Sequence, residues 1–147
     1  MLASGCGSAS NLGNVLIDIV AYRPTKSDTQ AELTLRFANE NVFPLAISDI
    51  SGKLYLNGTY VGKIENKNPI GIPQLSSLNR NVLLLIENPA FMQQLRGGTA
   101  AISYRFESLL RLDVSEERMK IRGVSNGQID SASLRTEPAT ESKPSVR

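Results

Sequence analysis

The feature that most constrains how this chain folds is an alternating apolar pattern that breaks once and then resumes, ELTLRFANENVFPLAISDISGKLYLNG. Its first part places an apolar side chain at every second position, a spacing typical of a β-strand with one buried face. These residues are Leu33, Leu35 and Phe37. The second part ends at Asn57-Gly58, a pair that favours the two-residue turn of a β-hairpin. The stretch therefore predicts a strand, a corner, a second strand and a tight turn.

The break between the two strands contains Asn39, Asn41 and Pro44. Short amide side chains can hydrogen-bond the local backbone and tolerate unusual dihedral angles. Proline fixes its own φ and restricts the residue before it. Beyond Pro44 the apolar residues start on odd-numbered positions and resume on even-numbered ones. Because a strand changes its buried face only through an extra residue, we predict a β-bulge within residues 48–50.

Five further segments have strand periodicity: NVLIDIVAYRP, TYVGKIE, QLSSLNRNVLLLIE, TAAISYRFESLLRLDV and ERMKIRGV. The stretch NKNPIGIP between two of them is expected to be a loop. In the first segment, one face should carry Val15, Ile17, Ile19 and Ala21. Asp18 in this segment has two interpretations, a functional carboxylate or a strand-edge charge that discourages association between sheets, and we favour the second.

A single short helix is expected near residues 89–96, with Asn88 as N-cap, Pro89 in the first turn and glycines at its end. Its buried stripe should contain Phe91 and Leu95, which are four residues apart. About seven strands and one helix fit an all-β protein, an antiparallel β-sandwich of immunoglobulin or fibronectin-III type. A closed β-barrel is the alternative architecture.

Composition divides the chain into three parts. Residues 1–13 hold the single cysteine, Cys6, and a small polar spacer, GSASNLG. Residues 14–130 carry all of the strand patterns and are expected to form one domain. Residues 131–147 have almost no apolar content and two prolines, which predicts a disordered tail.

The residue types exclude most catalytic chemistry. The chain has no histidine, so it lacks the commonest general base and metal ligand, and one cysteine cannot form an internal disulfide or a thiolate zinc cluster. Carboxylate-only hydrolysis stays open in principle, but the acids lie mostly at outward strand positions or in the tail. No Gly-rich phosphate motif is present, and a net charge of +2 without tryptophan or a basic stripe disfavours nucleic-acid binding. We therefore expect no enzyme activity, metal, cofactor, small-molecule substrate or nucleic acid.

The interrupted pattern resembles the signature of the water stress and hypersensitive response (WHy) domain of the group-2 late embryogenesis abundant (LEA) proteins. That signature is an alternating strand, Asn-Pro-Asn, two residues, a proline, an aliphatic pair and a strand closed by Asn-Gly. The matching residues are Asn39 and Asn41, Pro44, the aliphatic pair Leu45 and Ile47, and the turn Asn57-Gly58. Glu40 stands where the family usually has its first proline, so the chain departs from the pattern at this corner.

The resemblance implies a β-sandwich without enzymatic activity that is associated with tolerance of desiccation and other stress. It transfers no binding site, because the matched residues are those that shape corners. Our first functional hypothesis is a stress-associated envelope protein that acts by weak contacts with membranes or other proteins. The alternative is an immunoglobulin-like accessory module that docks a specific envelope protein, for example by adding a strand at an exposed edge.

The segment LASGCGS near the N-terminus indicates a cellular location. Ala3-Ser4-Gly5-Cys6 resembles a bacterial lipobox, which typically has Leu, a small residue, Gly or Ala, and then Cys. The charged and hydrophobic parts of such a signal should precede it, so we expect the sequence to be part of a longer precursor. We predict that Cys6 is lipidated and anchors the protein in the bacterial cell envelope, in the outer membrane on its periplasmic side. An incidental free thiol, and with it a soluble protein, is the alternative.

Overall fold

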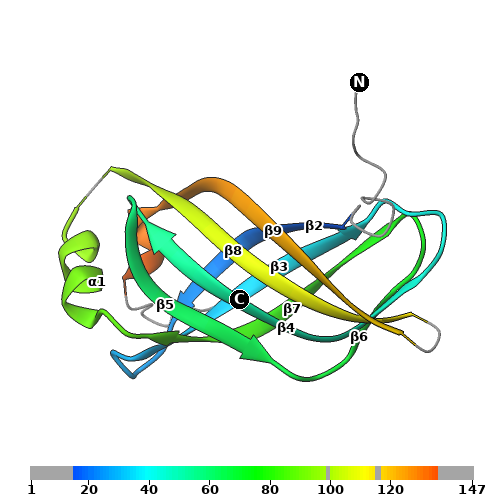
Figure 1. Cartoon of the computed structure of the whole chain (residues 1–147). Coiled ribbons are helices and arrows are strands. Elements are labelled where there is room, and N and C mark those ends of the chain that lie inside the picture. Colours follow the sequence, from blue (N-terminus) through cyan, green and yellow to red (C-terminus); the bar gives the residue numbers. More distant parts are fainter. Residues whose placement is uncertain (1–14, 99, 115–116, 136–147) are drawn as a thin grey trace, which may run out of the picture.

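The computed structural model describes residues 15–98, 100–114 and 117–135 (Figure 1). In this part of the chain there are eight β-strands, one α-helix and one 3₁₀ helix. In order these are β2 (Val15–Pro24), β3 (Gln30–Asn39), β4 (Leu45–Leu56), β5 (Thr59–Asn66), β6 (Ile70–Ile72), β7 (Ser76–Ile86), α1 (Pro89–Arg96), β8 (Ala101–Val114), β9 (Glu117–Asp130) and the 3₁₀ helix η2 (Ser131–Leu134).

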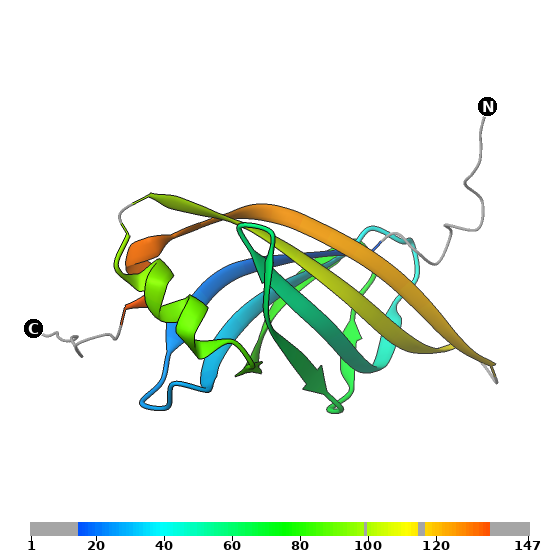
Figure 2. The ribbon, with the colours of Figure 1, turned by 60° about the vertical axis from the view of Figure 1, so that its left-hand side comes forward.

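All the strands belong to one antiparallel sheet in the order β2-β3-β7-β5-β4-β8-β9, with the short β6 paired to the start of β4. The sheet curls strongly, so that its first and last strands approach each other (Figures 1 and 2). It is therefore nearly closed, and its apolar inner faces enclose one core. This arrangement confirms the all-β, antiparallel, sandwich-like class, with both layers drawn from one continuous sheet.

The core follows the alternation of the strands. On β3 the predicted inward residues Leu33, Leu35 and Phe37 are fully buried. On β4 the buried side chains change from Ile47 to Ile50, and the register with β8 shifts between Ile47 and Asp49. The predicted β-bulge is thereby confirmed.

The turn between β4 and β5 has the predicted form. Asn57 has φ +50° and Gly58 has φ +82°, and a two-residue type I′ hairpin turn requires positive φ at both positions. Asn57 is also bound across the sheet, since its backbone N donates to Ser103 O at 2.8 Å and its Oδ1 accepts from Ser103 N at 3.0 Å. The turn therefore fixes the local chain direction and the position of β8.

Strand β2 differs from the expectation at its second half. Its register with β3 shifts between Ile19 and Ala21, so Tyr22 is buried while Ala21 is exposed. The expectation that Ala21 shares the inner face with Ile19 is wrong. Both faces of this segment are apolar, so the extra residue leaves no visible break in the alternation.

The stretch NKNPIGIP is not entirely a loop, because it contains β6, and this strand raises the count from the expected seven to eight. Ile70 and Ile72 are buried on either side of an exposed glycine. A strand of three residues between two prolines is too short to show a period.

The helix and the C-terminal boundary also need correction. In α1 the fully buried residue is Met92, while Phe91 and Leu95 are only partly buried against the core. Residues 131–134, which the composition assigned to the tail, form η2, and Leu134 is fully buried. The folded part therefore extends to Leu134. Residues 1–14 and 136–147, with the predicted spacer and the rest of the predicted tail, lie outside the described residues.

Candidate functional site

Two places on the fold concern function. We call residues 39–44, which run from the end of β3 to the residue before β4, the corner, because they include Asn39, Asn41 and Pro44, three of the residues that resemble the WHy signature. We call the space between the edge strands β2 and β9 the seam. The corner was singled out by the sequence, and the seam was not.

The corner is organised by the side chain of Asn39, which is buried. Its Nδ2 lies within hydrogen-bond distance of three backbone oxygens, those of Phe43 at 2.9 Å, Ile72 at 3.2 Å and Pro73 at 3.1 Å. Its Oδ1 accepts from the backbone N of Asn41 at 2.9 Å and from Nδ2 of Asn41 at 3.0 Å. One amide thus ties the end of β3 to the loop that follows and to the chain after β6.

The corner is also joined to the turn between β6 and β7. Asn41 is buried, and its backbone O accepts from Leu75 N at 3.1 Å. Leu75 has φ +52°, a left-handed conformation that leucine rarely adopts. Pro44 is exposed and immediately precedes β4, and Glu40, in the place of the family's first proline, is exposed as well. The two asparagines therefore shape the corner and its contact with a second loop.

The predicted lipidation site, Cys6, lies outside the described residues. The chain enters the described fold at Val15, whose Cα partner in the sheet is Asn39. The segment that carries Cys6 thus joins the fold at the end where the corner lies (Figure 1).

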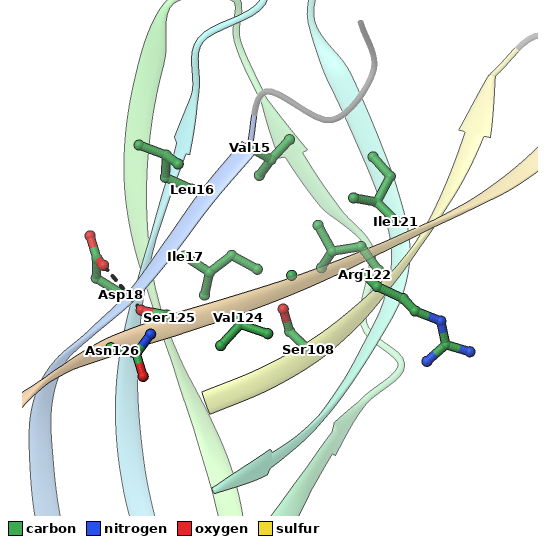
Figure 3. Close-up of a pocket in the computed structure, with 12 residues that line it drawn as sticks. Val15, Leu16, Ile17, Asp18, Ser108, Ile121, Arg122, Val124, Ser125 and Asn126 are labelled. Carbon is green, nitrogen blue, oxygen red and sulfur yellow. Dashed lines mark hydrogen bonds between the residues drawn. The ribbon is translucent and has the colours of Figure 1, made fainter. Parts of the chain in front are cut away.

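The seam contains a partly open cavity of about 390 Å³ (Figure 3). No backbone ladder joins β2 to β9 within the described residues. The cavity is lined by Val15 to Asp18 of β2, Ser108 and Leu110 of β8, and Ile121 to Asn126 of β9. Ile17 and Ser108 point into the space between the strands in Figure 3.

Hydrogen bonds that involve side chains connect β2 with β8 and β9, in place of the backbone hydrogen bonds of a sheet. Ser125 Oγ donates to Asp18 Oδ1 at 3.2 Å, and Ile19 N donates to Tyr104 Oη at 3.3 Å. The ring of Tyr104 lies against Gly127 of β9, where an added Cβ would be only 2.7 Å from the ring. A residue without a side chain is therefore needed at this position for Tyr104 to reach across β9 to β2.

Asp18 lies on β2, which is an edge strand of the sheet, and its role in discouraging association between sheets stays a prediction. Its Oδ2 is 3.5 Å from Nη2 of Arg36 on β3, so the carboxylate contacts a neighbour on each side. It bridges the seam and has no second carboxylate among the residues that line the cavity. This arrangement gives no acid–base pair of the kind that hydrolysis requires.

Ser108 of β8 is one of the polar residues that line the cavity. It is 8% exposed, and its hydroxyl forms no hydrogen bond with another described residue. Its oxygen is reachable from the cavity, because the fully buried side-chain atoms without a partner in the described residues are Tyr22 Oη and Arg96 Nε. The cavity therefore has a lining of mixed polar and apolar groups, and its other polar residues are Asp18, Arg122, Ser125 and Asn126.

The sequence carried a signal for the seam that went unrecognised. Ser108 is a polar residue at an inward position of β8, between Phe106 and Leu110, and it pairs with Gly123 of β9. Gly127 is paired with Tyr104 in the same register. Small residues facing an otherwise apolar strand indicate an unfilled space, but only once the register is known.

Other chemical signals lie apart from the seam. Burial raises the pKa of Tyr22 to about 12, while the guanidinium of Arg96 acts in the opposite direction. In residues 15–98, 100–114 and 117–135 no three His, Cys, Asp or Glu side chains are grouped as metal ligands would be. Across the same ranges, no helix has the length and apolar character that crossing a membrane needs.

No protein-family profile matches the chain, and no curated protein sequence matches it. Solved structures do resemble it. AT1g01470 from Arabidopsis thaliana is 16% identical with a TM-score of 0.53, over 88% of this chain and 80% of that one. At2g46140.1, named as a late embryogenesis abundant (LEA) protein, is 14% identical with a TM-score of 0.51, over 83% of this chain and 74% of that one. At these identities the likeness is one of fold, and this chain has a fold similar to that of a LEA protein.

Proposed function

We propose that this protein is a non-enzymatic, stress-associated protein of the group-2 LEA type, held at the bacterial cell envelope by a lipidated Cys6. The observation that carries the proposal is the corner. Asn39 and Asn41, which resemble the asparagines of the WHy signature, are buried and hydrogen-bonded to each other there, and the surrounding fold is similar to that of a LEA protein. The residues that carry the family resemblance thus have a structural role in this chain, which is to hold the corner in place by hydrogen bonds.

The chemistry of the cavity supports a role without catalysis. A nucleophilic serine needs a base within hydrogen-bond reach, and Ser108 has none among the described residues. The chain contains no histidine. The role that we propose is instead one of weak contacts with membranes or other proteins.

Drying tests the stress-associated role. Two unrelated enzymes are dried and rehydrated with this protein, or with an equal mass of an unrelated β-sandwich of similar size. We expect the enzymes to keep more activity with this protein. Equal activity with both additives would contradict a protective role.

Detergent partitioning tests the anchor. The protein is expressed with a complete upstream lipoprotein signal and compared with Cys6→Ser. The parent should enter the detergent phase and show an acylated N-terminal peptide by mass spectrometry, because two acyl chains suffice for stable anchoring. If both proteins stay in the aqueous phase, Cys6 is not an anchor.

The seam favours a second candidate function, a module that docks an envelope protein by strand addition. Ile19 N points into the seam, and backbone groups of alternate residues share one side of a strand. Ile17 therefore presents its N–H and C=O to the same space. Lys120 and Arg122 of β9 are exposed and form no ion pair with a described residue, so the occupant would be an extended segment with acidic side chains.

A second copy of this chain fits the seam less well. Antiparallel pairing of two β9 strands about Arg122 would place that arginine opposite its own copy, and like charges opposite each other destabilise a sheet. A pull-down from envelope extract should therefore retain one stoichiometric partner with the parent and lose it with Arg122→Glu. Equal retention by both proteins would contradict docking at the seam.

A further inference from the structure

One end of the fold brings together the start of β2, the end of β3 and the start of β7. Val15 pairs with Asn39, and Asn39 pairs with Ser76, so these residues form one row across the sheet. The corner and the turn that contains Leu75 follow directly on this row (Figures 1 and 2). We call these two loops the tip.

The tip carries three large apolar side chains that face solvent. Val42 is 77% exposed, Leu75 is 68% exposed and Phe43 is 38% exposed. The other exposed large apolar residues in the described ranges lie on strands: Leu16, Val20, Leu83, Leu85 and Val124. One or two exposed apolar residues on a strand are ordinary, whereas three on two joined loops form a patch.

Leu75 combines exposure with an unfavourable backbone conformation. Its φ of +52° belongs to a region that turns usually fill with glycine or asparagine. The conformation is held by the bond from Leu75 N to Asn41 O and by the bond from Asn39 Nδ2 to Pro73 O. Strained positions that the surrounding structure maintains are found at binding sites. Neither core packing nor turn chemistry explains a leucine at this position.

We propose that the tip inserts Val42, Phe43 and Leu75 into the headgroup region of a lipid bilayer. Apolar side chains gain free energy when they leave water for the boundary between headgroups and acyl chains. The nine residue steps from Cys6 to Val15 span at most roughly 30 Å. An acylated Cys6 would therefore keep this end of the fold close to the lipid surface. In this respect the inference rests on the proposed anchor.

The small size of the patch favours lipid over a protein partner. A stable protein interface buries roughly 800 Å² on each partner and uses about 20 residues per side. Three apolar side chains on two short loops provide much less. A lipid surface needs no matching shape, and two weak attachments hold a protein at a bilayer more firmly than one.

The test uses the full chain with Cys6→Ser, so that its outcome does not depend on acylation. The chain has no tryptophan, and Phe43→Trp therefore introduces a single fluorescent reporter at the tip. The probe is a vesicle of phosphatidylethanolamine and phosphatidylglycerol. We expect the emission to shift to shorter wavelength on vesicle addition and the protein to sediment with the vesicles.

Leu75→Asn separates the lipid role from a structural one. Asparagine suits positive φ, so this variant should be at least as resistant to urea as its parent. Its partition into vesicles should fall about tenfold, because one exposed leucine no longer enters the boundary. The matched control is Leu83→Asn, on β7 and away from the tip, which should leave the partition unchanged.

The outcomes separate the two proposals. No emission shift and no sedimentation of the Cys6→Ser chain would overturn the tip inference, even if the acylated parent is membrane-bound. Equal vesicle binding by Leu75→Asn and its parent would overturn it as well. Vesicle binding through the tip, without acylation of the parent, would support the tip and refute the anchor.

Discussion

The corner and the seam both lie where the backbone hydrogen bonding of the sheet stops. They differ in how many side-chain hydrogen bonds replace it. At the corner the side chain of Asn39 contacts the backbone of four residues and closes the gap. At the seam two side-chain bonds hold one part, and the rest stays open around a cavity. Dense hydrogen bonding thus makes the corner a fixed shape, and sparse hydrogen bonding leaves the seam able to take an occupant.

We expect the largest loss of stability from a substitution that disrupts the corner. Asn39→Ala removes both the donor and the acceptor of a buried amide and leaves several backbone groups without partners. An unpartnered buried group costs about 1 to 3 kcal/mol, so the free energy of unfolding should fall by about 3 kcal/mol in urea denaturation. Asn41→Ala should cost about 1 kcal/mol.

The control for the corner is Asn79→Ala on β7, where the side chain is exposed and forms no hydrogen bond with a described residue. Its effect should stay within about 0.5 kcal/mol. An Asn41→Ala protein that remained fully stable but lost membrane or partner binding would show that the corner itself is a binding site.

The next largest loss of stability is expected from a substitution at the part of the seam where Tyr104 reaches β2. Gly127→Ala would put a Cβ 2.7 Å from the ring of Tyr104, so the ring or the strand must move. Overpacking of this kind costs about 1 to 3 kcal/mol, measurable by thermal or urea unfolding. At Gly123 the added Cβ would lie 3.4 Å from Ser108 Oγ, so Gly123→Ala should cost less. Equal stability losses would contradict the specific role given to Gly127.

How well each region could be predicted depends on how far apart its contacting residues lie in the sequence. The turn at Asn57-Gly58 and the bulge near residue 48 were predictable because turn chemistry and alternation act over a few neighbouring residues. The asparagines of the corner were recognisable for the same reason. Their bonds to Ile72 and Pro73 cross more than thirty residues, so only the sheet register reveals them.

The seam could not be predicted in the same way. The bond from Ser125 to Asp18 joins residues that are 107 positions apart. It exists because eight strands curl until the two edges meet, and no local pattern records that curvature. Gly127 in the sequence looks like any strand glycine until its Cβ position is compared with the ring of Tyr104.

A smaller effect concerns a buried polar group at the other end of the fold. Tyr22 Oη and Arg96 Nε are both buried without a hydrogen-bond partner among the described residues. Tyr22→Phe should therefore leave the free energy of unfolding unchanged or raise it by up to about 1 kcal/mol at pH 7. A clear loss of stability in urea at pH 7 would show that the hydroxyl has a partner.

The same variant has a pH signature. The pKa of Tyr22 is raised by burial from 10.0 to about 12 in the folded chain. The folded state then holds its proton longer than the unfolded state, so stability is fully present below pH 10 and falls as the pH rises toward 12. Tyr22→Phe should make this alkaline loss shallower. Part should remain, because partial burial and the hydrogen bond to Glu87 raise the pKa of Tyr60 to about 12 as well.

The last comparison is between two serines on opposite sides of the seam, Ser125 and Ser108. Ser125 donates to Asp18, whereas the hydroxyl of Ser108 has no partner among the described residues. Ser125→Ala should therefore cost about 0.5 to 1.5 kcal/mol, and Ser108→Ala should be neutral or slightly stabilising. Both are measured by urea unfolding of the full chain. If Ser108→Ala costs as much as Ser125→Ala, the hydroxyl is already satisfied within the cavity. The seam would then be as completely bonded as the corner, and the open seam would no longer support strand docking.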